Sequence, residues 1–391
     1  MATKFRFNYN NQTVDFDDYY VRSDIFTQGN LWGWGYGSFG TLGDNTTLSR
    51  SSPVQTVAGG INWKQVANGI TFTVAIKTDG TLWSWGLNAY GQLGTNTTTS
   101  RSSPVQTITG GTNWVQVACG NYHAAAIKTD GTLWLWGYNY WGQIGNNTSG
   151  PASPFMVSSP VQTITIGTNW KQVSCGYGHT AAIKTDGTLW TWGLNSNAML
   201  GDNTTTSRSS PVQTVAGGTN WQQVACGYFY TAAIKTDGTL WTWGLNTNGQ
   251  LGDNTITNRS SPIQTVTGGT SWKQVACGLA HAAAIKTDGT LWLWGNNNNG
   301  QLAINTITSN SSPVQTITRG TDWKQVACGD RHTTAIKTDG TLYCWGYNNV
   351  GQLGNNTITD RSSPVQIVIG GTNWKQVAGG GTNTAAITYI N

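Results

Sequence analysis

Residues 114–137 read W-V-Q-V-A-C-G-N-Y-H-A-A-A-I-K-T-D-G-T-L-W-L-W-G and form the most informative segment of the chain. The segment contains three runs that we predict as β-strands A, B and C of one unit: Trp114–Cys119, His123–Lys128 and Leu133–Gly137. Asp130-Gly131 separates the last two runs and favours a tight hairpin, because Gly accepts the positive φ that such turns need. A fourth run, Pro160–Thr163, completes a predicted unit of four antiparallel strands, with strand D last.

The motif L-W-x-W-G or a close variant of it occurs seven times. The copies are 51 residues apart, except for one interval of 56, and start at Leu31, Leu82, Leu133, Leu189, Leu240, Leu291 and Leu342. The chain has no Glu among its 16 acidic residues but holds 51 Gly and 21 Trp, a composition that disfavours helices and suits strands joined by turns. The sequence therefore predicts an all-β fold, a seven-bladed β-propeller of four-stranded antiparallel blades.

The ring must close with strands from both ends of the chain. The last unit ends with Trp374–Ala378 as strand A and Thr384–Thr388 as strand B, so Leu31–Gly35 and Pro53–Thr56 must supply its strands C and D. A second segment, Ile25–Asn30, also matches the strand B pattern and competes for the same place. We expect Thr384–Thr388 to fill it, because this run follows directly from its own strand A.

The charge pattern gives no reason to expect a nucleic-acid partner. The net charge is only +5 over 391 residues, and the Lys residues recur at two repeat positions instead of gathering in one patch. No apolar run approaches 18 residues, and the first ten residues lack the apolar core of a secretory signal. We predict no membrane segment, and no binding to duplex DNA beyond that of a neutral control protein.

Residues with catalytic or metal-binding chemistry fall at repeat positions, which distributes them around the ring. All four His start strand B, where we expect each to hydrogen-bond within its own blade: His123, His179, His281 and His332. Five Cys end strand A and are predicted to be buried free thiols, with Cys344 as a sixth: Cys119, Cys175, Cys226, Cys277 and Cys328. Six Asp precede Gly in the B–C turns and are interpreted as turn residues, and the repeated Trp as core. The sequence predicts no metal, no cofactor and no catalytic site.

The loops between strands A and B differ from copy to copy, although the strands are nearly identical. They read Ile70-Thr71, Asn121-Tyr122, Tyr177-Gly178, Tyr228-Phe229, Leu279-Ala280, Asp330-Arg331 and Gly381-Thr382. The C–D loop of the third copy carries a five-residue insertion, and in an up-and-down blade it lies on the same face as the A–B loops. Aromatic side chains in loops are common anchors of recognition surfaces. The candidate binding residues are Tyr122, Tyr140, Trp141, Phe155, Met156, Tyr177, Tyr228 and Phe229. The alternative is sequence drift with local packing of a long loop.

Residues 1–24 have no repeat pattern and are predicted to be a docking or assembly arm, followed by the propeller at 25–391. Their six aromatic residues offer apolar area for packing against a neighbouring chain or, alternatively, the arm's own propeller: Phe5, Phe7, Tyr9, Phe16, Tyr19 and Tyr20.

The motif W-G-x-N-x-x-G-Q-L-G at 85–94 and the motif V-x-C-G-x-x-H-x-x-A at 117–126 resemble the regulator of chromosome condensation repeat, over roughly residues 25–391. The resemblance implies a seven-bladed propeller. It leaves function open, because that family includes nucleotide exchange factors, a bacterial β-lactamase inhibitor and many uncharacterised proteins.

We expect a bacterial or bacteriophage member of this family that is a noncatalytic structural or recognition propeller, part of a virion or an extracellular surface. Its expected partners are proteins of a larger assembly or a host receptor. The alternatives are an inhibitor-like protein-binding module, a nucleotide exchange factor and a propeller enzyme.

Overall fold

The computed structural model describes residues 29–57, 60–151, 155–164 and 167–389, and the backbone of 8–9 and 12–13. Strands dominate these residues. The helical structure described is the short 3-10 helix η2 (Ser38–Gly40), and no helix of the described residues is long and apolar enough to cross a membrane.

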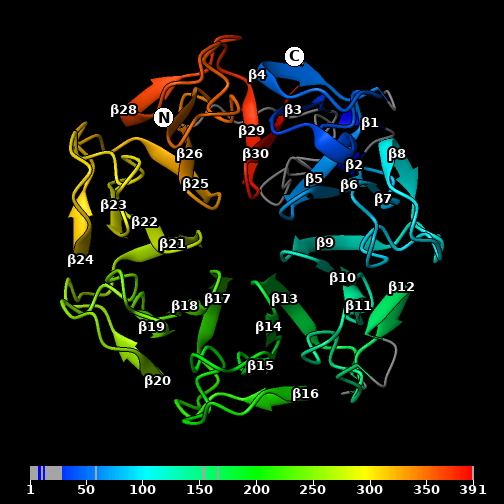
Figure 1. Cartoon of the computed structure of the whole chain (residues 1–391), viewed down its shortest axis with the longest axis horizontal. Helices are drawn as coiled ribbons and strands as arrows, with labels where there is room; N and C mark the ends of the chain where they lie inside the picture. The colour runs from blue at the N-terminus through cyan, green and yellow to red at the C-terminus, as the bar shows by residue number, and fades with distance from the viewer. Residues whose placement is uncertain are drawn as a thin grey trace.

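Seven four-stranded antiparallel sheets form a ring of blades, and the prediction of a seven-bladed propeller is confirmed (Figure 1). The innermost strands, A, are β5 (Trp63–Asn68), β9 (Trp114–Cys119), β13 (Trp170–Cys175), β17 (Trp221–Cys226), β21 (Trp272–Cys277), β25 (Trp323–Cys328) and β29 (Trp374–Gly379). The B strands are β6 (Phe72–Lys77), β10 (His123–Lys128), β14 (His179–Lys184), β18 (Tyr230–Lys235), β22 (His281–Lys286), β26 (His332–Lys337) and β30 (Asn383–Thr388). The C strands are β7 (Leu82–Gly86), β11 (Leu133–Tyr138), β15 (Leu189–Gly193), β19 (Leu240–Gly244), β23 (Leu291–Gly295), β27 (Leu342–Gly346) and β3 (Leu31–Gly35). The outermost strands, D, are β8 (Arg101–Gln106), β12 (Met156–Gln162), β16 (Arg208–Gln213), β20 (Arg259–Gln264), β24 (Asn310–Gln315), β28 (Arg361–Gln366) and β4 (Arg50–Gln55).

The closing blade combines both ends of the propeller in the order β29-β30-β3-β4. β30 pairs with β3 from Leu31↔Ile387 to Gly35↔Asn383, so the predicted closure by residues 384–388 is confirmed. Backbone bonds extend the contact beyond the strands: Thr388 N donates to the carbonyl of Asn30 at 3.0 Å. Ring closure is therefore noncovalent.

The B–C turns have the structure that their Asp-Gly sequence predicts. In the first of them Asp79 Oδ1 accepts hydrogen bonds from the Thr81 backbone N–H at 2.9 Å and from its hydroxyl at 2.7 Å. Gly80 has a φ of 78°, which L-residues with side chains rarely adopt. The acidic residue therefore stabilises the turn.

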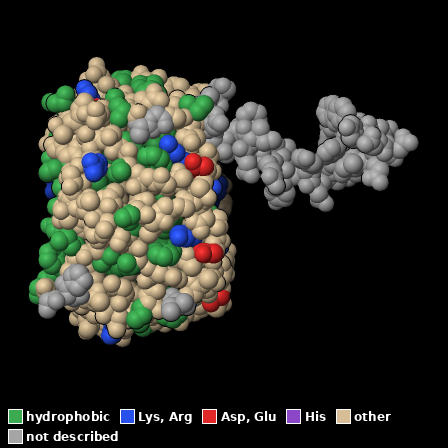
Figure 2. Space-filling view, turned by 90° about the vertical axis from the view of Figure 1, so that its right-hand side faces the viewer, with side chains coloured by type: hydrophobic (Ala, Val, Ile, Leu, Met, Phe, Trp, Pro, Cys, Tyr) green, Lys and Arg blue, Asp and Glu red, His purple; other side chains and the backbone are tan. Residues whose placement is uncertain are grey.

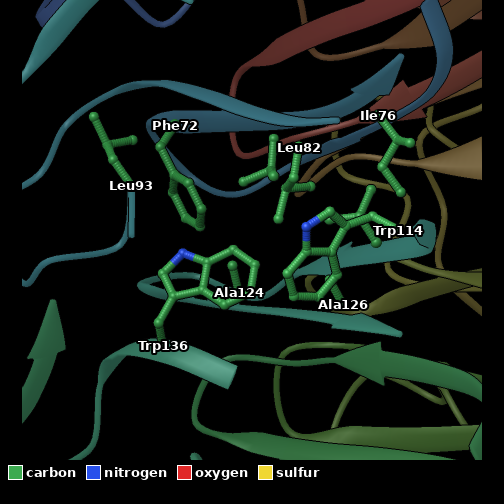
Figure 3. Packing of buried hydrophobic residues seen from close by; sticks show 10 residues of the cluster. Phe72, Ile76, Leu82, Leu93, Trp114, Ala124, Ala126 and Trp136 are labelled. Atoms are coloured by element: carbon green, nitrogen blue, oxygen red, sulfur yellow. The ribbon is translucent and has the colours of Figure 1, made fainter. Parts of the chain in front are cut away.

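The apolar core lies between neighbouring blades. Figure 3 shows one such interface, where Phe72 and Leu82 of one blade meet Trp114 and Trp136 of the next. Trp136 also donates its indole N–H to the carbonyl of Gln92 at 2.8 Å, which satisfies its polar atom. Burial of about 200 Å² per Trp contributes up to about 5 kcal/mol of gross hydrophobic free energy. The first Trp of each L-W-x-W motif is only half-buried, so the prediction that all repeated Trp are core is wrong for this position.

A side-chain amide joins each inner strand to its neighbour. Val173 N donates to Gln116 Oε1 at 2.9 Å, and Gln116 Nε2 donates to the carbonyl of Val173 at 2.9 Å. The same two bonds join Gln172 to Val224, Gln223 to Val275, Gln274 to Val326 and Gln376 to Val66. The side-chain amide of this Gln thus makes the two hydrogen bonds that a paired backbone residue would make, and in this way it bridges two blades.

The D strands begin earlier than predicted, so Met156 is the first residue of β12, paired with Tyr138, and not part of a loop. In the predicted arm, β1 (Asn8–Tyr9) pairs with β2 (Gln12–Thr13). Phe5, Phe7, Phe16, Tyr19, Tyr20 and the side chain of Tyr9 lie outside the described residues.

Candidate functional site: the loop face of the propeller

The A–B and C–D loops emerge side by side on one face of the ring, which we call the loop face. The residue after the Gly of the C-strand motif bonds to the A–B loop of its own blade: Tyr138 N donates to the carbonyl of Tyr122 at 2.9 Å, and Leu194 N to that of Gly178 at 2.8 Å. Side chains from both kinds of loop therefore lie within reach of one another.

Six of the eight predicted binding residues lie close together on the loop face. Trp141 lies 5.2 Å from Tyr177 between ring centroids, and Tyr177 stacks on Tyr228 at 4.5 Å. Phe229 is 4.9 Å from Tyr228, and Tyr140 is 5.8 Å from Trp141. Tyr122, the sixth, joins this group through two tyrosines that the sequence analysis did not select.

These two tyrosines are Tyr90 and Tyr138, from two neighbouring blades. Tyr90 is 5.2 Å from Tyr122 and 4.9 Å from Tyr138, and Tyr138 is 5.3 Å from Trp141. Tyr90 stands in a C–D loop at the repeat position that Trp141 occupies in the next copy, a signal that could have identified it. Tyr138 ends β11, at a position that is also Tyr in two other copies. We define the aromatic patch as Tyr90, Tyr122, Tyr138, Tyr140, Trp141, Tyr177, Tyr228 and Phe229.

The two other predicted residues do not join the patch through ring contacts of this kind. Phe155 is 40% exposed, and its backbone carbonyl accepts a hydrogen bond from Asn139 N at 2.7 Å. Met156 belongs to β12, as described above. Among the described residues, neither makes an aromatic contact with the patch.

A glycine makes room for the only Trp outside the repeat positions. A Cβ added at Gly178 would lie 2.5 Å from Cε3 of Trp141, much closer than real Cβ contacts allow. The equivalent loop position carries Tyr122 or Phe229 in the two neighbouring blades. The Tyr177-Gly178 loop and the inserted Trp141 therefore fit each other across two blades.

A cavity of about 90 Å³ lies in the mouth of the central channel, beside the patch. Each blade contributes the last residue of strand A, the Gly that follows it and the first residue of the A–B loop. The last of these positions is occupied by Ile70, Asn121, Tyr177, Tyr228, Leu279, Asp330 and Gly381. The A–B loops are tied to each other here: Leu279 N donates to the carbonyl of Asp330 at 3.1 Å, and Asp330 N to that of Gly380 at 3.1 Å. Backbone hydrogen bonds between blades thus fix the shape of the mouth.

Asp330 is the charged residue of this lining. Burial raises the pKa of its carboxyl to about 6, and the nearby positive charge of Arg331 opposes the shift only in part. Burial, followed by the negative charge of Asp330, raises the pKa of Tyr228 to about 12. The Asp330 carboxyl therefore titrates close to neutrality, whereas Tyr228 stays protonated.

The thiols in the cavity wall have no nucleophilic character. All six Cys are free, and Cys119, Cys277 and Cys328 are partly exposed rather than buried. Burial raises the pKa of the Cys226 thiol to about 12 and those of the other thiols further. Each stays a neutral thiol that behaves as a small apolar group.

The four His connect blades, so the prediction that each bonds within its own blade is wrong. His123 Nε2 lies 3.0 Å from the hydroxyl of Thr180 in the next blade, and His281 Nε2 lies 3.0 Å from that of Thr333. Burial lowers the pKa of His123, His179 and His281 to about 3 and that of His332 to about 4, so the rings are neutral. Among the described residues no three His, Cys, Asp or Glu side chains are placed to hold a metal ion.

Comparison with known proteins gives a consistent family assignment. The RCC1-like domain profile matches residues 156–390, and the regulator of chromosome condensation (RCC1) repeat profile matches residues 28–76 and 79–127. The chain is 34% identical over 340 residues to the ultraviolet-B receptor UVR8 of Arabidopsis thaliana, which covers 85% of this chain and 76% of that protein. It is 29% identical to the E3 ubiquitin-protein ligase HERC2 of Mus musculus over 85% of this chain, but that match spans only 7% of HERC2.

Solved structures show the same fold at low sequence identity. Human WBSCR16 has a TM-score of 0.81 at 22% identity, with 92% of this chain and 98% of that chain covered. Yeast RCC1 (Prp20), solved with Kap60 bound to it, has a TM-score of 0.81 at 20% identity, with 93% and 90% covered. The matched profiles describe repeats and a propeller domain, and none of them is a catalytic family.

Proposed function

The chain belongs to the regulator of chromosome condensation repeat family, and we propose that it is a noncatalytic protein-binding module that recognises its partner through the aromatic patch. Members of the same fold bind proteins: Prp20 is known in complex with Kap60, and its binding to Gsp1p and histones has been characterised. The proposal applies this mode of action, and none of these named partners, to the present chain.

The observation that carries the proposal is the continuous series of ring contacts across four neighbouring blades. Tyr90 comes from the blade of β5–β8, Tyr138 and Trp141 from that of β9–β12, Tyr177 from the next and Tyr228 from the one after. Large aromatic side chains near the centre of an interface supply most of its binding free energy. Because each ring packs against its neighbours, little conformational entropy is lost when a partner covers them.

A surface of this kind favours a protein partner over a polyanion. Figure 2 shows the propeller edge-on, and on this outer side, too, the charged side chains are few and scattered. The patch itself contains no Lys or Arg that could neutralise phosphate groups.

The test compares two double variants in affinity capture from an extract of the source organism. Trp141→Ala with Tyr177→Ala removes the middle of the patch. The control, Ile307→Ala with Ile358→Ala, removes two side chains that are 64% and 65% exposed in the C–D loops of blades outside the patch. We expect a partner that the wild type and the control retain and the patch variant loses. With the isolated partner, dissociation constants should rise at least 30-fold for the patch variant, a loss of about 2 kcal/mol or more.

Equal retention of every captured protein by the patch variant and the wild type would contradict the proposal.

The aromatic patch does not determine the cellular setting. A place on a virion or extracellular surface is proposed from the uncharged polar composition alone, and the eukaryotic relatives named above give no support for a bacterial or bacteriophage type.

A further inference from the structure

The cavity in the channel mouth and the aromatic patch share two side chains. Tyr177 and Tyr228 line the cavity and also form the stacked pair of the patch, with ring centroids 4.5 Å apart. A protein that covers the patch therefore also covers the entrance of the channel. A side chain projecting from such a protein would enter the cavity.

The cavity contains a carboxylate that the protein does not neutralise. In the described part of the chain, the Asp330 side chain makes no hydrogen bond or ion pair, and no Lys or Arg lines the cavity. The neighbouring Arg331 extends to its own blade, where its guanidinium carbon lies 6.0 Å from the ring of Tyr347. An enclosed carboxylate without a counter-ion is unfavourable. Burial accordingly raises the pKa of the Asp330 carboxyl.

The rest of the wall suits an alkylammonium group. The faces of Tyr177 and Tyr228, which line the cavity, attract cations. Ile70, Leu279 and the neutral thiols provide apolar surface for methylene groups. The cavity volume of about 90 Å³ accommodates the end of one long side chain.

We propose that this cavity binds the ammonium group of a lysine side chain, which the protein partner inserts into the channel mouth when it docks on the aromatic patch. The ammonium group pairs with the Asp330 carboxylate, and the methylenes contact Leu279 and Ile70. That the lysine belongs to a protein partner rests on the proposed function, whereas the affinity of the cavity for an alkylammonium ion does not.

Other ligand classes fit the lining less well. An anion would meet the Asp330 carboxylate and no cationic side chain. A metal ion would find a single carboxylate, with no second and third ligand of its kind among the described residues. A neutral apolar group would displace water from the Asp330 carboxylate without pairing with it, which is unfavourable.

The first experiment uses n-butylammonium ion as the probe and n-butanol as its neutral analogue. The methyl groups of Ile70 and Leu279 are local reporters in methyl-labelled NMR spectra, because both side chains line the cavity. We expect butylammonium to shift these signals saturably and butanol to bind at least tenfold more weakly. Asp330→Asn should weaken butylammonium binding at least tenfold.

Asp322→Asn is the matched control. It removes the same charge in a D–A loop, on the opposite face, where Asp322 forms a partly exposed ion pair with Lys337 at 3.1 Å. This variant should bind butylammonium like the wild type. Equal binding of butanol and butylammonium, unchanged binding by Asp330→Asn, or no shift of the Ile70 and Leu279 methyls would each overturn the proposal.

The second experiment tests the inserted lysine separately from the proposed function. It uses the partner captured above. If Asp330→Asn lowers partner affinity at least tenfold, and the Asp322→Asn control does not, a partner cation in the cavity is supported. If Asp330→Asn binds the partner like the wild type while the patch variant loses it, the inserted lysine is refuted and the proposed function stands. If butylammonium binds but the patch variant keeps every partner, the proposed function and the inserted lysine both fail.

Discussion

The side-chain amide of Gln376 makes two hydrogen bonds with the backbone of Val66, which lies 310 positions earlier in the chain. Val66 N donates to Gln376 Oε1 at 3.0 Å, and Gln376 Nε2 donates to the carbonyl of Val66 at 3.2 Å. These bonds join β29 to β5 across the boundary where the first and last parts of the ring meet. Elsewhere the same amide bridge joins blades that are consecutive in the chain.

Gln376→Ala should therefore weaken ring closure. The change leaves the N–H and C=O of Val66 without their partners, and we expect it to lower the free energy of unfolding by about 1–2 kcal/mol. Urea denaturation measures this loss. The control Gln223→Ala removes the equivalent bridge between β17 and β21 and should cost a similar amount. Faster amide hydrogen exchange in β3 and β30 is expected for Gln376→Ala alone, and equal exchange in both variants would contradict a special role at closure.

A buried His should make the protein sensitive to acid. Burial lowers the pKa of His281 in the folded state to about 3, below its ordinary 6.5. Its contribution to stability is complete above pH 6.5 and is lost as the pH falls towards 3. His281→Phe places at this position the residue that another blade carries as Phe72. The loss of unfolding free energy between pH 7 and pH 5 should be smaller by about 2 kcal/mol in this variant.

Tyr230→Phe is the control for that measurement, because Tyr230 stands at the same repeat position and stays uncharged over this range. Its pH dependence should match that of the wild type. An unchanged pH dependence in His281→Phe would show that the ring is charged or exposed in the folded protein.

The strands and their order could be predicted because their signals are local and repeated. The Asp-Gly turns fix the B–C hairpins, and the run 384–388 follows its own strand A closely enough to take the closing position beside Leu31–Gly35. The start of each D strand could not be predicted, because its first residues, such as Arg50-Ser51-Ser52, lack the β-branched and aromatic side chains that are typical of strands. Gly35 pairs with Arg50 only across a register shift.

The contacts between blades could not be derived from the repeat. Period and spacing place His123 at the start of a strand, but the Thr180 hydroxyl reaches it from the next blade. The same limit applies to the site. The aromatic loops were visible in the sequence, whereas Tyr90 joins the patch only through the packing of two blades. The burial of Asp330 in the channel mouth depends on all seven A–B loops at once.

Asp330 should destabilise the protein above pH 6 in the absence of a bound cation. Its pKa is raised from 3.8 in the unfolded chain to about 6, so the folded state favours the neutral carboxyl. Stability is then lost as the pH rises from 3.8 to 6 and stays lower above this range. Burial raises this pKa and the charge of Arg331 opposes the shift. The other titratable groups near Asp330 are Tyr122, Tyr177, Tyr228, Cys277 and Cys328.

Asp330→Asn should consequently be more stable than the wild type by on the order of 2 kcal/mol at pH 7.5, and nearly equal to it at pH 4. Urea midpoints at the two pH values give the difference, and contributions from the His residues cancel because both proteins share them. Asp322→Asn should gain no stability at pH 7.5, because it removes a carboxylate that is paired with Lys337. A variant that is less stable than the wild type at pH 7.5 would refute the buried, unneutralised carboxylate.

The protein should bind duplex DNA no better than a neutral control protein. Six lysines lie over the ring of the Trp or Tyr at the second position of the C-strand motif, with 4.3–5.2 Å between Nζ and the ring centroid. Three arginines pair with Asp44, Asp202 and Asp253. These cations are spread around the ring and do not form a surface that tracks phosphates. Fluorescence anisotropy with a labelled duplex at physiological ionic strength is the measurement. Tight, strongly salt-dependent binding would contradict this prediction.

Deletion of residues 1–24 should leave a folded propeller that no longer assembles with its partner complex. Every blade strand starts at Leu31 or later, and the described contacts of the preceding chain begin at Gly29, whose carbonyl accepts a hydrogen bond from Trp63 N at 3.2 Å. Circular dichroism and the thermal midpoint should therefore change little. Deletion of residues 1–35 is the comparison: it removes β3 and leaves β30 and β4 without the strand between them. This longer deletion should prevent cooperative folding.

Assembly is measured as co-purification of each variant with the complex from which the wild type is isolated. The six aromatic residues of 1–24 offer the apolar area for this contact, so the short deletion should abolish incorporation while the aromatic patch remains intact. Incorporation at full occupancy without residues 1–24 would show that the segment is not an assembly element. In that case the loop face must provide the attachment, and the Trp141→Ala, Tyr177→Ala variant should then lose it.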